Sequence, residues 1–210
     1  MNVRRLTMGV AAVLLAGTTG LLAQDVCTQF TMAPPVGSWA SYRGMGSAWT
    51  ISLVGTEELN GTTHNWFELD MAGAEQPTIM KILMPGGFYQ LGQVKPAAII
   101  MKVGGQPAMK MSDAMMDMVV QNMGSNPAND IMASCASARE LGTESVTVAG
   151  GSFRAMHYAF AGAEPGEAWL SKKVPFGLVK WQGADGKAVE LVALGTDATT
   201  KITGTPIQMP

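Results

Sequence analysis

The sequence predicts an α+β fold in which a curved antiparallel β-sheet, a half-barrel, packs on one or two short helices. Segments that alternate apolar and polar residues follow one another along most of the chain, which is typical of strands with one buried face. Helical spacing of apolar residues is clear in one short stretch only. The 25 glycines and 11 prolines among 210 residues supply turns for many strands.

The N-terminus has the pattern of a secretory signal peptide. Two arginines precede a run of apolar and small residues from 8 to 23, and a polar residue follows. This run is shorter than the roughly 20 apolar residues that span a bilayer, so we expect cleavage after Ala23 rather than a membrane anchor. We therefore expect a signal peptide at 1–23 and a single domain at 24–210, located in the periplasm or secreted.

The chain has two cysteines, Cys27 and Cys135, and both follow the expected cleavage site. An even number in an exported protein suggests one disulfide, which would stabilise the fold by about 2–4 kcal/mol. Two buried thiols or a metal pair are the alternatives. Since His64 and His157 are the only histidines, no zinc site with the usual cysteine and histidine spacing can be assembled. We expect no metal and no cofactor.

The first strands are predicted at 49–53, 67–71 and 78–84. The first two should form a hairpin with one dry and one wet face, and the Asn60-Gly61 pair marks a tight turn near its end. On this prediction Glu68 and Asp70 lie on the wet face. The third segment ends at a Pro-Gly-Gly sequence.

The spacing of apolar residues changes from the two-residue period of strands to helical spacing before a second set of strands begins. After a strand at 97–103, residues 112–123 show helical spacing, with Ser112 as the N-cap. A second short helix at 129–139 would carry Cys135. Further strands are expected at 146–148, 153–160, 167–171, 178–182 and 187–194.

The last third of the chain carries a family resemblance. The stretch GTESVTVAGGSFRAMHY at 142–158 forms a strand–turn–strand pattern, and WLSKKVPFGLVK follows at 169–180. This order resembles exported bacterial proteins related to the periplasmic lipoprotein carriers of the LolA and LolB type, most clearly over 142–195. The resemblance implies a half-barrel whose open side is plugged by helices and which shields acyl chains or other apolar ligands.

We therefore expect an exported, non-catalytic binding or carrier protein for an apolar, lipid-like ligand. Inward-facing side chains would surround the ligand and exclude water from it. The expected ligand-binding residues are Trp49, Ile51, Leu53, Phe67, Leu69, Met80, Ile82, Met84, Met115 and Met118.

Two other functions stay open. One is a structural or interaction module with a filled core, which would act through a sheet edge or a partner surface. The other is copper(I) handling, since eight of the 17 methionines lie between Met101 and Met132 and thioethers bind this ion.

Several function classes are disfavoured. The formal net charge of −2 and the lack of a basic block give no support for nucleic-acid binding. No Gly-x-Ser-x-Gly motif or P-loop is present. His157 falls inside a predicted strand, where a structural, hydrogen-bonded imidazole is the more common role, and we expect His64 to be exposed. We expect no enzyme activity and no catalytic residue.

Overall fold

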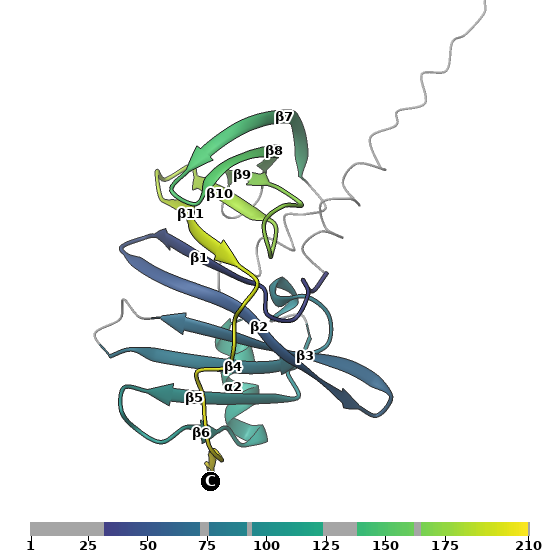
Figure 1. The fold of residues 1–210 in the computed structure, drawn as a ribbon, viewed down its shortest axis with the longest axis vertical. Helices are drawn as coiled ribbons and strands as arrows, with labels where there is room; N and C mark the ends of the chain where they lie inside the picture. Colours follow the sequence, from purple (N-terminus) through teal and green to yellow (C-terminus); the bar gives the residue numbers. More distant parts are fainter. Residues whose placement is uncertain (1–31, 72–75, 92–93, 124–137, 162–164, 210) are drawn as a thin grey trace, which may run out of the picture.

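The computed structural model describes residues 32–71, 76–91, 94–123, 138–161 and 165–209. Twelve strands form one sheet in the order β12-β6-β5-β4-β3-β2-β1-β11-β10-β9-β8-β7. Neighbouring strands pair antiparallel, except that β12 runs parallel to β6 (Figure 1). The strands are β1 (Trp39–Gly44), β2 (Ser47–Leu59), β3 (Thr62–Met71), β4 (Thr78–Met84), β5 (Ala98–Val103), β6 (Met109–Lys110), β7 (Arg139–Val148), β8 (Gly151–Phe160), β9 (Gly166–Leu170), β10 (Leu178–Gly183), β11 (Ala188–Gly195) and β12 (Ile207–Gln208).

The predicted fold class, an α+β half-barrel packed on helices, is wrong. The described residues contain one α-helix, α2 (Asp113–Met123), and one 3-10 turn, η1 (Phe88–Gln90), so the fold is essentially all-β. The apolar face of the sheet is buried where the sheet curves and where η1, α2 and the loop between β9 and β10 pack on it, since Tyr89, Met116 and Phe176 belong to the same core. The ring centroids of Phe67 in β3 and Phe176 between β9 and β10 are 6.3 Å apart, although several strands separate them in the sheet order.

The sheet has two faces that differ in chemistry. On the face that we call inner, Ile51, Leu69 and Met80 are neighbours across β2, β3 and β4, and Leu53, Phe67 and Ile82 form the next row. The opposite, outer face carries Glu68 and Lys81 in the same strands. Strict alternation in these strands explains why their core-facing residues could be identified from the sequence.

The predicted hairpin of β2 and β3 is confirmed, and it is longer than expected. Asn60 and Gly61 form its turn with positive φ angles of 52° and 74°. This backbone conformation suits a two-residue hairpin and explains the Asn-Gly pair. β1, which pairs with both β2 and β11, was not predicted.

The last five antiparallel strands, β7 to β11, curl at one end of the molecule (Figure 1). The turn between β7 and β8 reaches back to β11, where the Gly150 amide donates to the Leu191 carbonyl at 3.1 Å. A Cβ on Gly150 would lie 3.0 Å from the Leu191 side chain, so this close approach favours glycine.

After β11 the chain returns across the outer face as an extended segment, residues 196–206, which we call the C-terminal strap (Figure 1). It begins beside β1, where the Trp39 indole donates to Asp197 at 2.8 Å. It ends by adding β12 to β6. On the way Ile202 is buried against Ile100 and Ala108 in a small second core.

Three predictions fall wholly or largely outside the described residues: the signal peptide at 1–23, the Cys27–Cys135 disulfide, and the second helix at 129–139. Of that helix only its last two residues are described, and Arg139 there begins β7. The first predicted helix is confirmed as α2, within one residue at its start.

Candidate functional site

Nine of the ten predicted ligand-binding residues belong to one apolar cluster on the inner face. Six are buried and three are half-buried against them, whereas Met118 on α2 is 55% exposed. The half-buried side chains are those of Trp49, Leu69 and Met115. The structure therefore brings the residues together, except for Met118.

The inner face is also filled by aromatic side chains that the sequence analysis did not select. Phe88 and Phe176 both approach Phe67, with ring centroids 5.7 and 6.3 Å away, and Tyr42 is 1% exposed. Phe176 has a positive φ of 64° and precedes Gly177, so a tight turn places its ring in the core. This turn was visible as a Pro-Phe-Gly sequence, but its position against β3 follows only from the coiling of the sheet.

Two tyrosines are buried in this core. The Tyr42 hydroxyl donates to the Leu178 carbonyl at 3.2 Å, which connects β1 to the start of β10. Burial raises the pKa of Tyr42 well above its ordinary value, and the neighbouring Tyr89 raises it further. Burial likewise raises the pKa of Tyr89 above the range of an exposed phenol. Both side chains are therefore neutral packing elements at physiological pH.

Two shallow hollows on the described surface are open to solvent. One, of about 470 Å³, lies over the ends of β8, β9 and β10 and includes Glu167 and Gln182. The other, of about 130 Å³, lies between β1, β2 and β11 and includes Arg43 and Trp49. Of the ten predicted ligand-binding residues, only Trp49 lines either hollow.

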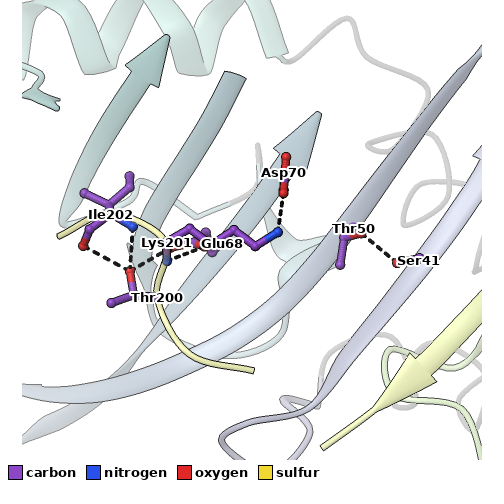
Figure 2. A network of polar contacts seen from close by, with 7 residues as sticks. All are labelled: Ser41, Thr50, Glu68, Asp70, Thr200, Lys201 and Ile202. Carbon is purple, nitrogen blue, oxygen red and sulfur yellow. Dashed lines mark hydrogen bonds and ion pairs between the residues drawn. The ribbon is translucent and has the colours of Figure 1, made fainter. Parts of the chain in front are cut away.

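A buried carboxylate on the outer face anchors the C-terminal strap (Figure 2). Glu68 is 3% exposed. It accepts hydrogen bonds from the Thr200 hydroxyl at 2.7 Å and from the Lys201 amide at 3.0 and 3.2 Å. The Lys201 ammonium pairs with Asp70 beside it. The face that was predicted to be exposed to solvent is therefore buried at Glu68, because the strap covers it.

A row of polar and aromatic side chains crosses the outer face of β7, β8, β9 and β10. Each ring nitrogen of His157 lies 3.1 Å from a carboxylate oxygen, one of Glu144 and one of Glu167. The imidazole stacks on Trp169, with ring centroids 4.3 Å apart, and the Trp169 indole donates to Glu144 at 2.5 Å. Lys180 lies 5.5 Å from the Trp169 ring. In this geometry His157 joins three strands.

The described residues contain no group of three or more His, Cys, Asp or Glu side chains that could hold a metal ion. Several methionines of the predicted copper segment pack in the core: Met101 and Met115 lie against the same apolar cluster. Met111 and Met116 are buried in the core, while Met118 faces solvent. Within the same described part, no helix has the length and apolar character needed to cross a bilayer.

Among the described residues, one edge of the sheet is a long strand that pairs on one side only. β7 spans ten residues and pairs with β8, whereas the opposite edge ends in the two-residue β12. A bulge at Leu141 interrupts the ladder, and a regular segment from Gly142 to Val148 follows. The side chains of Thr143, Ser145 and Thr147 are exposed along it.

Comparisons with known proteins leave the family open. No family model and no curated protein matches the chain. Solved structures that match include a putative lipoprotein from Parabacteroides distasonis, at 11% identity over 78% of this chain and 97% of that chain, with a TM-score of 0.39. A putative exported protein with a YmcC-like fold from Bacteroides fragilis matches at 10% identity over 79% and 99% of the two chains, with a TM-score of 0.41.

A third match is the MucA/MucB complex of Pseudomonas aeruginosa, at 13% identity and a TM-score of 0.31. It covers 88% of this chain, which spans only 59% of the matched chain. Identities and TM-scores this low establish neither a family nor a function, and the resemblance to LolA and LolB carriers is not directly shown.

Proposed function

We propose that the protein is an exported, non-catalytic interaction module that contacts a protein partner through the β7 edge of its sheet. The single observation that carries this proposal is the packing of the inner face, which its own aromatic side chains fill. The export signal predicted at 1–23 supports the location.

Carriage of a lipid-like ligand needs an enclosed apolar cavity, of about 300 Å³ or more for a small molecule. The residues that would line such a cavity belong to one packed cluster instead, and in it the rings of Phe88 and Phe176 approach Phe67. A carrier would have to open this core, at the cost of exposing rings that now bury one another.

The β7 edge supports contact with protein. A strand at the edge of a sheet presents unpaired amide and carbonyl groups, which can pair with an added strand. Many exposed edges carry free charges that prevent this pairing. Between Gly142 and Val148 the single charged side chain is Glu144, and it is engaged by His157 and Trp169.

A photo-crosslinking residue at Ser145 tests the proposed function in cells that express the full chain. Ser145 is exposed on the β7 edge, and Gln182 is exposed on β10 but pairs with Ala188 on one side and Glu167 on the other. We expect protein adducts from Ser145 and none from Gln182. Equal adducts from both positions, no protein adduct from Ser145, or a lipid bound stoichiometrically to the purified protein would contradict the proposal.

A further inference from the structure

We infer that His157 is a proton-dependent clamp, which holds Glu144 of β7 firmly when its ring carries two protons and loosens that side chain when it carries one. The clamp lies on the outer face, where β8 separates β7 from β9. It needs no partner molecule, so it stands or falls independently of the proposed function. Its effect is to make the hold on the β7 strand depend on pH.

Three neighbouring strands place the side chains of the clamp on one face. His157 in β8 and Trp169 in β9 are Cα partners. Glu144 in β7 is the Cα partner of Ala155, two positions before His157. Glu167 lies two positions before Trp169 in β9. Because residues two apart in a strand project from the same face, the imidazole, the indole and both carboxylates meet there.

The two ring nitrogens of His157 make different contacts. Nε2 forms a hydrogen bond with a Glu167 oxygen at 3.1 Å. Nδ1 lies 3.1 Å from Oε1 of Glu144, which also accepts a hydrogen bond from the Trp169 indole at 2.5 Å. A carboxylate only accepts, and a neutral imidazole has one proton to donate. The bond to Glu167 therefore places that proton on Nε2, and the contact of Nδ1 with Glu144 becomes an ion pair only in the charged ring.

Stacking fixes the ring between these carboxylates. The imidazole lies on the Trp169 indole with ring centroids 4.3 Å apart and planes inclined by 17°. The His157 side chain is 16% exposed, whereas that of Glu144 is about half exposed. Loss of the Nδ1 proton leaves a lone pair facing a carboxylate oxygen, with no hydrogen between them. Since the ring is held and Glu144 can reach water, Glu144 is the side chain that loosens.

Further charged side chains lie around the clamp. Lys180 in β10 is 5.5 Å from the indole ring centroid and pairs with Glu190 of β11 at 3.3 Å. Arg139 in β7 lies in the cross-strand row that contains Glu167. Arg154, in the same strand as the imidazole, is three positions away and projects from the opposite face. The charged ring is thus flanked by two carboxylates at 3.1 Å, while Lys180 has an acidic partner of its own.

Amide hydrogen exchange of the purified protein at pH of about 5.5 and about 7.5 tests the clamp. This range covers the titration of an ordinary imidazole but not that of an ordinary carboxyl. After correction for intrinsic exchange rates, we expect the β7 amides that bond to β8 to be about threefold more protected at the lower pH, the size expected of a partly exposed ion pair. Amides of β4 and β5 are the internal reference and should show no such change.

The two histidines of the chain provide matched variants. We expect H157Q to lose the pH difference in β7 and H64Q, whose ring lies in β3, to keep it. E144Q should also lose the difference, because the group that faces Nδ1 is then uncharged. E190Q is its control: Glu190 pairs with Lys180 on the same face, so this variant should respond as wild type does.

Nitrogen-15 NMR of the histidine rings gives a second readout, in which neutral His157 should carry its proton on Nε2. Equal β7 protection of wild type at both pH values, a difference that persists in H157Q or E144Q or disappears in H64Q or E190Q, or a neutral ring protonated on Nδ1 would each overturn the inference. Reference amides that match wild type show that a variant is folded, so a response lost from β7 alone reports the clamp.

Discussion

A buried carboxylate holds the C-terminal strap against the outer face of the sheet. Glu68 is buried, and its carboxylate oxygens accept hydrogen bonds from the Thr200 hydroxyl and the Lys201 main-chain amide of the strap. A hydrogen bond to an ionised acceptor is stronger than one between neutral groups. Removal of the acceptor would leave buried donors unpaired, which is costly.

We expect E68A to lower the free energy of unfolding by about 2–3 kcal/mol, because the Thr200 hydroxyl and the Lys201 amide lose their acceptor. Urea denaturation measures this change. E58A is the control: Glu58 is exposed, so its substitution should change stability by less than about 0.5 kcal/mol. Equal stability of E68A and E58A would show that the strap is not anchored there.

The buried phenols of Tyr42 and Tyr89 predict a loss of stability at alkaline pH. Their pKa values are raised in the folded state, so above pH of about 10 the unfolded chain releases their protons while the folded chain keeps them. Stability is therefore complete below pH about 10 and falls above it, by at most ~1.4 kcal/mol per pH unit for each phenol. Urea denaturation of wild type and Y89F between pH 9 and 11, in about half-unit steps, should show a shallower fall for the variant.

At the scale of the element, the middle of the strap is held more firmly against the sheet than the terminal strand β12. Ile202 is 6% exposed in the second core, whereas Ile207 in β12 is 58% exposed. I202A should therefore destabilise the protein by about 2–4 kcal/mol, and I207A by less than about 0.5 kcal/mol. Thermal unfolding of the matched pair measures the difference. Similar losses in both variants would mean that the terminal strand, rather than the Glu68 anchor region, secures the strap.

The helix α2 allows a similar comparison. Met116 is 3% exposed and packs in the main core, while Met118, predicted as a ligand contact, is 55% exposed. We expect M116A to cost about 2–3 kcal/mol and M118A to be nearly neutral, because only the first leaves a cavity. Chemical denaturation of both variants checks this, and a large loss in M118A would contradict the placement of the helix.

Elements with strict alternation could be predicted from the sequence, and elements made by distant pairing could not. β2, β3 and β4 show the two-residue period clearly, and nine of the ten selected side chains do meet on one face. β6 and β12 contain two residues each, too few for any period. The burial of Glu68 depends on Thr200, 132 positions away, for which the local sequence carries no signal.

At the scale of the whole molecule, helical cover of the apolar face is only partial, because α2 is the single α-helix among the described residues. An apolar face must be covered by another layer, by closure or by helices. Here Met116 of α2 covers part of the face, and the curvature of the sheet brings Tyr42 in β1 to Leu178 in β10 and Phe67 to Phe176 in the loop between β9 and β10. The sequence pattern shows that a face is apolar, but it does not show what covers that face.

Native mass spectrometry of the protein isolated from the cell envelope tests this account most directly, because it detects cargo without assuming its identity. Under gentle ionisation we predict the mass of the chain without 1–23, with no lipid attached. A stoichiometric lipid adduct that survives purification would show that the interior accommodates cargo, and it would contradict the filled core.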